Sequence, residues 1–253
     1  MQGQTQRRLL DDDIRHEALD EVGSTNTECF ERARSGDAGP LWITARRQIG
    51  GRGRRGRVWT SEHGNLYASL LLTEPASLDA VRTLPLAVAV AVHAAISRLL
   101  PMGGAQAEIK WPNDVLIGRA KTCGILLESE ILTGGRLAVV TGIGINISAK
   151  PEDAPYPVTC LADHGAHVSP EEMFAHLYME MREALLLWNG GAGAAAIVER
   201  WRRGACGIGE RITVNLQERS LSGVFAGIDE QGFLILDTGS ETMSIAAGDV
   251  FFS

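Results

Sequence analysis

The signals for helices and strands change abruptly near residue 206, and this change limits the possible folds more than any other feature. Upstream, long helical segments are interspersed with apolar strand-like runs, whereas after residues 201–209 helical periodicity stops and short strands with turn residues continue to the end. A chain of 253 residues is long enough for one large unit and one small one. We therefore predict an N-terminal tail at 1–15, a large domain at 16–206 and a small β domain at 207–253.

The large domain is predicted to combine helices and strands without a regular alternation. Thr25 and Glu28 have capping-box spacing at the start of the first helix, and Gly36 is placed to end it. Because no βα repeat is present, the pattern favours an α+β domain with a mixed sheet. Further helices are predicted at 85–100, 169–189 and 194–203, and strands at 41–44, 66–72, 115–117, 124–132 and 137–147. Five short strands, with the number and spacing of a small barrel, are predicted downstream at 211–216, 221–228, 233–236, 242–246 and 249–252.

Composition excludes several broad classes of protein. With 45% hydrophobic and 22% charged residues, the chain has the composition of an ordinary soluble globule. The longest apolar run, 84–100, contains His93 and Arg98 and is too short and too polar to span a bilayer, and residues 1–13 lack the apolar stretch of a secretory signal. The four cysteines are scattered, which predicts buried thiols, and the six histidines form no metal-binding pattern. We therefore expect a cytoplasmic enzyme or binding protein with no membrane partner and no metal cage built by the protein.

Residues 46–57, which we call the arginine segment, are unusually rich in arginine and glycine. The segment contains six arginines, four glycines and no acid, so the other 241 residues carry a net charge of −13. Six guanidinium groups on a glycine-rich backbone repel one another, and we expect the segment to be mobile until an anion gathers it. Glycines also let backbone N–H groups and arginine side chains converge on phosphate or carboxylate oxygens. The segment therefore predicts an anionic ligand.

Three alternatives remain for the arginine segment. The spacing of Gly51, Gly53 and Gly56 matches a dinucleotide-binding fingerprint, but the residues that follow do not have a helical pattern. RNA-binding tracts of arginine and glycine usually occur in basic or disordered chains, whereas this one lies within an acidic folded domain. A solvated loop without a role would explain the charges but not the four interleaved glycines.

Two of the three lysines in the chain, Lys110 and Lys121, lie close together in a protein whose 21 other cations are arginines. This choice favours a site that needs a compact ammonium group, with chance as the alternative in a chain of only three lysines. Residues 108–117 and 121–128 are predicted to form a hairpin whose first strand is deformed by Pro112. Alternation of side chains would place Lys110, Pro112 and Asp114 on one face. The simplest alternative is a hairpin with a surface ion pair, worth about 0–1 kcal/mol.

The chain contains four motifs, in the following order: GRGRRGR at 51–57, KWPND at 110–114, KxxGILxE at 121–128 and GIGIN at 142–146. Together they closely resemble the biotin protein ligases, the biotin–[acetyl-CoA-carboxylase] ligases, and the resemblance covers about residue 16 to the end. It implies an α+β mixed-sheet catalytic domain that resembles the fold of class II aminoacyl-tRNA synthetases and biotin ligases, followed by a small SH3-like β-barrel. The segment 16–206 would then bind biotin and ATP.

The resemblance implies a reaction in two steps. The biotin carboxylate attacks the α-phosphate of ATP, and biotinyl-AMP then passes its acyl group to a lysine of a biotin carboxyl carrier protein. Mg²⁺ would arrive mainly with ATP. Many bacterial relatives carry an N-terminal winged helix that binds an operator; only some twenty residues precede Glu21, so we expect no DNA partner and no repressor activity. A homodimer is left open by the sequence.

The resemblance also implies roles for individual residues. Lys121, Arg52 and Arg54 would act in catalysis, and Asp114 would assist Mg²⁺. The biotin site would comprise Ser24, Thr25, Asn26, Gln48, Arg52, Gly53, Arg54, Lys121, Gly142 and Gly144. The ATP or adenylate site would comprise Arg55, Arg57, Trp59, Lys110, Asn113, Asp114 and Asn146. For three of these there is a structural alternative, since Ser24 or Thr25 could simply cap a helix and Asn146 could satisfy a strand end.

Two other functions stay open at this point. The arginine segment and the terminal β domain could together hold nucleic acid without catalysis, which would give salt-sensitive RNA binding. The acyl-adenylate chemistry could also serve a different acid, because lipoate ligases share a related architecture. Pyrophosphate exchange measured separately with biotin, lipoate and octanoate would distinguish these possibilities.

Overall fold

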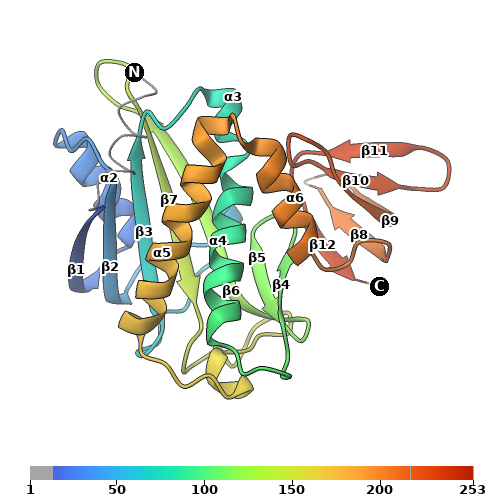
Figure 1. Ribbon diagram of the computed structural model, residues 1–253, viewed down its shortest axis with the longest axis horizontal. Helices are drawn as coiled ribbons and strands as arrows, with labels where there is room; N and C mark the ends of the chain where they lie inside the picture. The colour runs from blue at the N-terminus through green and yellow to red at the C-terminus, as the bar shows by residue number, and fades with distance from the viewer. Residues whose placement is uncertain (1–13, 217, 253) are drawn as a thin grey trace.

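The computed structural model describes residues 14–216 and 218–252. Its larger unit is built on a seven-stranded sheet in the order β1-β2-β3-β7-β6-β5-β4 (Figure 1). Strands β1 and β2 are parallel and every other neighbouring pair is antiparallel, which confirms the predicted mixed sheet. The strands are β1 (Arg15–Val22), β2 (Leu41–Gln48), β3 (Leu66–Thr73), β4 (Ala107–Lys110), β5 (Asp114–Ile117), β6 (Ala120–Ile131) and β7 (Leu137–Ile145).

Helices cover both faces of this sheet. The face seen in Figure 1 carries α4 (Leu84–Leu99) and α5 (Pro170–Trp188), which pack side by side, with α6 (Ala194–Gly204) beside them near the C-terminal sheet. The opposite face carries α2 (Thr25–Arg34), which packs on β2, β3 and β7. Short helices α3 (Leu78–Val81), η1 (Arg54–Gly56), η2 (Leu161–His164) and η3 (Asn189–Gly191) lie in the connections.

Strand β3 shows why the sheet needs cover on both faces, because all eight of its residues are buried. Alternate residues such as Leu70 and Leu72 belong to the large core beneath α4 and α5, whereas Leu71 packs with Cys29 and Phe30 of α2. Side-chain alternation therefore divides one apolar strand between two cores. Ser69 is on the α2 face too, and this position becomes important at the site.

The helix that packs most deeply is also the most apolar. The stretch Leu78–Leu99, which spans α3 and α4, is long and apolar enough to cross a membrane by length and composition, and 67% of its most apolar window is buried inside the fold. A soluble protein's core helix has this character, and α4 contacts α5, α6 and three strands. All four cysteines are buried and unpaired, as predicted.

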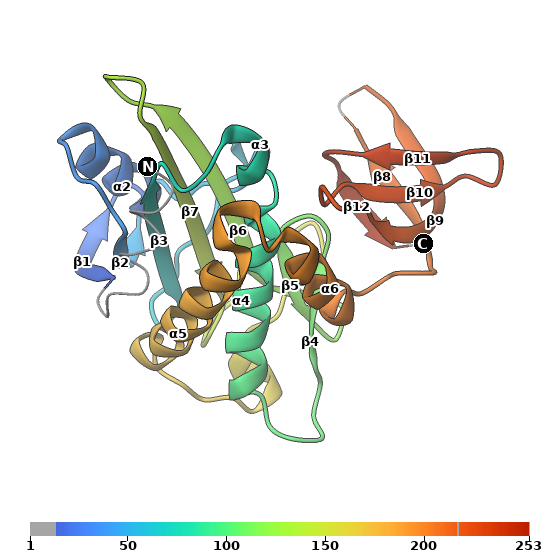
Figure 2. The ribbon, with the colours of Figure 1, turned by 45° about the horizontal axis from the view of Figure 1, so that its top comes forward.

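The chain then forms a second, smaller sheet set apart from the first (Figure 2). Its five antiparallel strands have the order β11-β10-β9-β8-β12, so β11 and β12 are its two edges. All five lie close to the predicted positions: β8 (Arg211–Asn215), β9 (Ser220–Ile228), β10 (Leu234–Asp237), β11 (Thr242–Ile245) and β12 (Asp249–Phe252). The change of pattern near residue 206 therefore marks the transition from helices to this sheet.

The structure differs from the sequence predictions at the start of the described chain. Residues 1–13 of the predicted tail lie outside the described residues, and Arg15 already belongs to β1. This strand was not predicted because it is an edge strand with mostly exposed or half-buried side chains and therefore has no apolar run.

The predicted hairpin forms between β5 and β6, which pair antiparallel, but the prediction of its first strand is corrected. Residues 108–117 do not form one strand: the chain reverses at 111–113 and makes two short strands, β4 and β5. Lys110 and Asp114 are register partners across this turn, so they do share a face, but as cross-strand neighbours. The proline-containing segment is the turn itself, consistent with the missing N–H of Pro112.

The predicted capping box of the first helix does not form. Ser24 occupies the N-cap position of α2 and its side chain makes no capping hydrogen bond. The backbone N–H of Thr25 instead donates to Oε1 of Gln48 at 2.9 Å, and the Thr25 hydroxyl oxygen lies 3.1 Å from the same atom. A side chain from β2 therefore satisfies the start of this helix, and Thr25 is drawn into a tertiary network rather than a local cap.

Candidate active site

A cavity of about 580 Å³ lies between the larger unit and the C-terminal sheet. It has the size of a small-molecule site. Its lining comes from the N-terminus of α2, the end of β2, the arginine segment, the turn between β4 and β5, and strands β6, β7 and β12. The predicted residues that line it are Ser24, Thr25, Asn26, Gln48, Arg52, Gly53, Arg54, Arg57, Trp59, Lys110, Asn113, Asp114, Lys121, Gly142 and Gly144.

Two predicted residues, Arg55 and Asn146, do not line the cavity. Arg55 points to the C-terminal sheet, where its Nη1 lies 3.0 Å from Asp249 Oδ2. The Asn146 side chain is buried and donates to the carbonyl of Thr159 at 3.1 Å. Its position fits the alternative in which it satisfies a strand end, and the predicted adenine contact at Asn146 is not supported.

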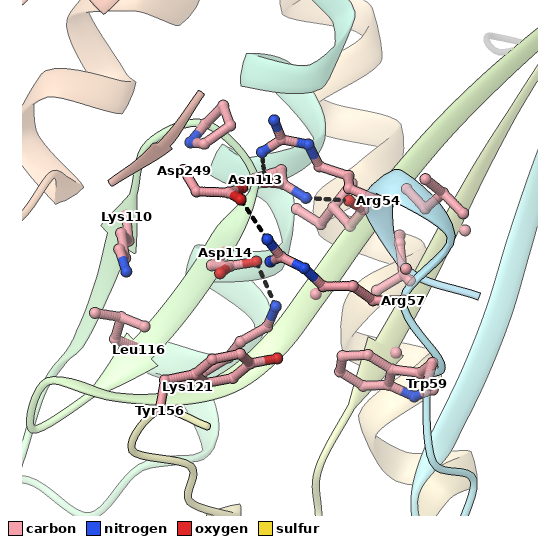
Figure 3. Close-up of a pocket in the computed structure, with 18 of the residues that line it drawn as sticks. Arg54, Arg57, Trp59, Lys110, Asn113, Asp114, Leu116, Lys121, Tyr156 and Asp249 are labelled. Atoms are coloured by element: carbon pink, nitrogen blue, oxygen red, sulfur yellow. Dashed lines mark hydrogen bonds and ion pairs between the residues drawn. The ribbon is translucent and has the colours of Figure 1, made fainter. Parts of the chain in front are cut away.

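The arginine segment is folded back on the rest of the protein. Arg52 pairs with Val58 in an isolated bridge, and a short 3₁₀ turn lies between them. Arg54 donates from Nη1 to Asn113 Oδ1 at 2.8 Å (Figure 3). Its Nη2 donates to the carbonyl of Gly248 at 3.1 Å. Burial lowers the pKa of Arg54. This guanidinium is therefore fixed at the boundary between the two units.

A carboxylate of the C-terminal sheet holds two more of these cations. Asp249 on β12 forms ion pairs with both Arg55 and Arg57, and its side chain is only 13% exposed. Sequence reasoning expected an external anion to gather the segment, but the protein supplies one itself. No local sequence signal marks Asp249, which lies 192 residues from Arg57.

We predict that Asp249→Asn loosens the arginine segment. Losing the charge removes both ion pairs, so the open form should become more populated and trypsin should cleave within residues 46–57 several-fold faster. A phosphate-bearing ligand should slow cleavage in both proteins, because its phosphates then provide the anion. An Asp79→Asn variant, whose carboxylate is 93% exposed, is the control. Equal cleavage of the Asp249 variant and the unchanged protein would contradict this role.

Lys121 on β6 occupies the centre of the cavity. Its Nζ lies 2.7 Å from Asp114 Oδ1 and is flanked by the rings of Trp59 and Tyr156, at 5.6 and 5.5 Å (Figure 3). Burial alone would lower the pKa of Lys121, but the Asp114 charge and hydrogen bond outweigh it and the pKa is raised. Lys121 is therefore a protonated, compact donor at the centre of the site.

Lys110 lies near the same carboxylate but in a different environment. Its Nζ lies 5.7 and 5.3 Å from the ring centres of Phe251 and Phe252 on β12. Burial lowers the pKa of Lys110, although the charge of Asp114 opposes the change. The aromatic end of the C-terminal sheet therefore positions this second ammonium group.

Two glycines of β7 leave room for neighbouring side chains. A Cβ at Gly144 would lie 2.5 Å from the indole of Trp59, and one at Gly142 would overlap Oδ1 of Asn26. The ring that packs on Gly144 is the indole of Trp59. At these two glycines the backbone of β7 itself lines the cavity.

Several cavity residues were missed by sequence reasoning. Tyr156 lies in an irregular segment after β7, and Phe251 and Phe252 lie on the last strand, so no motif connects them with Lys121 or Lys110. Ser69 does not line the cavity but hydrogen bonds to both Thr25 and Asn26. In the sequence it is an ordinary polar residue inside an apolar strand.

The described residues contain no group of three or more histidine, cysteine, aspartate or glutamate side chains that could hold a metal ion. Asp114 is the predicted carboxylate, and one of its oxygens already faces Lys121. The other two carboxylates that line the cavity, Asp249 and Glu210, are paired with arginines. Asp114 suits Mg²⁺ that enters with phosphates and keeps most of its other ligands as water. The residues therefore fit a nucleotide-borne ion.

Comparison with known proteins gives two family matches. Residues 20–146 match the biotin/lipoate A/B protein ligase family, and residues 207–253 match the biotin protein ligase C-terminal domain. The chain is 36% identical over 244 residues to a biotin–[acetyl-CoA-carboxylase] ligase of Paracoccus denitrificans, covering 92% of this chain and 99% of that one. It is 32% identical to the enzyme of the same name from Mycobacterium tuberculosis, covering 91% and 86%.

The fold comparison agrees. A biotin protein ligase from Aquifex aeolicus in complex with biotin and ATP superposes with a TM-score of 0.78 at 26% identity, covering 94% of this chain and 99% of that one. The match therefore extends over both the larger unit and the C-terminal sheet. Since family, relatives and fold agree over almost the whole length, the chain belongs to the biotin protein ligases of the biotin/lipoate A/B protein ligase family.

Proposed function

We propose that this ligase forms biotinyl-5′-AMP from biotin and ATP and transfers the biotin to one lysine of a biotin carboxyl carrier protein. The observation that carries the proposal is the cavity, in which Lys121, Lys110 and the arginine segment face a wall of neutral polar side chains. The uncharged bicyclic ring of biotin suits the polar wall. The biotin carboxylate and the ATP triphosphate suit the cations. The Aquifex relative was crystallised with these two ligands.

The first step needs two anions to approach each other. The carboxylate oxygen attacks the α-phosphorus, the bond from that phosphorus to the bridging oxygen breaks, and pyrophosphate leaves. Lys121 donates to both the carboxylate and the α-phosphate, which reduces their repulsion and stabilises charge on the phosphorus oxygens. Its position in the cavity lining supports this role. Arg54 and Arg52 bring further positive charge, and no covalent nucleophile of the protein is required.

A Mg²⁺ ion bound with ATP would neutralise phosphate charge, and Asp114 would hold it directly or through water. Asp114 also keeps Lys121 protonated, because its charge raises the pKa of the ammonium. Lys121 and the arginines thus bind the anions, and Asp114 orients Lys121.

In the second step, the amine of the acceptor lysine attacks the acyl carbon and AMP leaves. We assign both ligands to residues 16–206, and we assign to residues 207–253 the support of Lys110 and the arginine segment through Phe252 and Asp249. We place the reaction in the cytoplasm, where the carrier domain of acetyl-CoA carboxylase or a similar carboxylase would be the protein partner. The proposal is compatible with a monomer or a homodimer.

Pyrophosphate exchange tests the proposal. Exchange into ATP should depend on biotin and should be at least about 100-fold slower with lipoate or octanoate, since neither acid has polar ring groups for the wall. Faster exchange with lipoate than with biotin would mean that the enzyme activates lipoate instead. Salt-sensitive RNA binding without any acid-dependent exchange would favour a nucleic-acid binder instead.

A further inference from the structure

A continuous chain of hydrogen bonds lies behind the polar wall of the cavity. It runs from Glu128 on β6 through Asn26, Ser69 and Thr25 to Gln48 at the end of β2. The bond lengths along it are 2.7, 2.6, 2.7 and 3.1 Å. Thr25, Asn26 and Gln48 line the cavity, whereas Ser69 is fully buried and Glu128 lies outside the lining.

The two amides of this chain have fixed orientations. Nδ2 of Asn26 faces Glu128 and, at 3.4 Å, the carbonyl of Leu126, and both of these groups only accept hydrogen bonds. Oδ1 of Asn26 must therefore face Ser69. At the other end, the backbone N–H of Thr25 donates to Gln48 at 2.9 Å, so Gln48 must present its oxygen.

Counting protons along the chain gives an imbalance. Two amide oxygens and two hydroxyls make three oxygen–oxygen contacts, from Asn26 to Ser69, from Ser69 to Thr25 and from Thr25 to Gln48. The two hydroxyls supply only two protons, so one contact always lacks a hydrogen. The contact between Thr25 and Gln48 is the longest of the three, at 3.1 Å. The wall therefore has one acceptor too many at the point where it meets the cavity.

We propose that Glu128 and Ser69 are positioning residues that give this wall its surplus acceptor and thereby make it select a ring N–H donor of the ligand. Glu128 fixes the Asn26 amide, Asn26 accepts from the Ser69 hydroxyl and Ser69 accepts from the Thr25 hydroxyl, so the contact left without a hydrogen is that between Thr25 Oγ1 and Gln48 Oε1. An N–H group of the ligand relieves the imbalance, whereas an oxygen in the same place adds a repulsive contact. This inference rests on the proposed function, in which the ligand ring carries two ureido N–H groups.

The test compares biotin with two cyclic carbamate analogues, in each of which oxygen replaces one ureido N–H. Dissociation constants are measured by isothermal titration calorimetry. The unchanged protein should prefer biotin to one carbamate by at least about 100-fold. Glu128→Leu and Ser69→Ala should each reduce that ratio by about 10-fold or more, while the affinity for ATP stays the same. Glu128→Gln also loses the 3.8 Å ion pair with Arg52 but keeps an acceptor oxygen for Asn26, so it should retain the ratio.

Glu130→Leu is the matched control, because Glu130 lies two residues along the same strand and is 34% exposed against 33% for Glu128. It loses an ion pair with Arg34 but does not contact Asn26. Since Glu128 is partly exposed, its leucine variant should fold even if the Ser69 variant does not. A wild-type ratio in Glu128→Leu would overturn the inference and leave the proposed function intact. Failure of the unchanged protein to bind biotin would instead overturn the proposed function.

Discussion

Lys121→Ala is expected to lower biotin-dependent pyrophosphate exchange by at least about 100-fold. In the transition state the charge on the phosphorus oxygens grows, and a single well-placed donor is worth roughly 2.7–4 kcal/mol. Lys121 is 15% exposed and held between two aromatic rings, so water cannot easily replace its ammonium group. Exchange should be measured at saturating biotin and ATP, so that weaker binding does not hide the effect on the chemical step.

Lys121→Arg should not restore the rate. The planar guanidinium is larger than the ammonium and would have to fit between Trp59 and Tyr156 while keeping the contact with Asp114. Lys150→Ala provides the matched control, since Lys150 also pairs with an aspartate but is 43% exposed and lies outside the cavity lining. An exchange rate within a few-fold of normal for Lys121→Ala would remove this lysine from catalysis.

The sequence predicted the architecture well where apolar patterning is strong. Buried runs such as those of β3 and β7 have a continuous apolar character because both faces of the sheet are covered, and the five strands of the small sheet alternate with clear turn residues. Strand β1 has no such pattern because it is an exposed edge, and its pairing with β2 depends on tertiary contacts. Local sequence contains no information about that register.

Most of the site was predicted because its motifs are short and continuous. Lys110 and Asp114 pair across the short hairpin formed by β4 and β5. The glycines of β7 lie two residues apart on one face. The unpredicted part is long-range. Asp249 and Phe252 reach the cavity only because the small sheet packs beside the larger unit.

The proton imbalance at the polar wall could not be derived from sequence either. It depends on which atoms of Asn26 and Gln48 face Ser69 and Thr25, and these orientations follow from three-dimensional partners. The motif that contains Glu128 was recognised, but its chemistry becomes visible only when Asn26 is found 2.7 Å away. Residues that act through a neighbour are thus the hardest to predict.

Gly142→Ala is expected to have the second large effect, because it acts on the best-fixed side chain of the wall. A Cβ at position 142 would overlap Oδ1 of Asn26 and lie 3.0 Å from its Cγ. Asn26 has no free direction in which to move, since Glu128 and Ser69 hold both ends of its amide. We expect a loss of about 1–3 kcal/mol in the free energy of unfolding and a loss of about 100-fold in biotin affinity.

A double-mutant cycle with Asn26→Ala shows whether the clash is the cause. Removing the Asn26 side chain makes room for the new methyl group, so Gly142→Ala should then cost almost no stability. Biotin affinity should stay low in the double variant, because the amide that orients Ser69 is missing. Chemical denaturation of the four proteins measures the coupling energy, and biotin titration measures the affinity. A coupling below about 0.5 kcal/mol would mean that Gly142 is needed for another reason, such as strand twist or direct contact with the ligand.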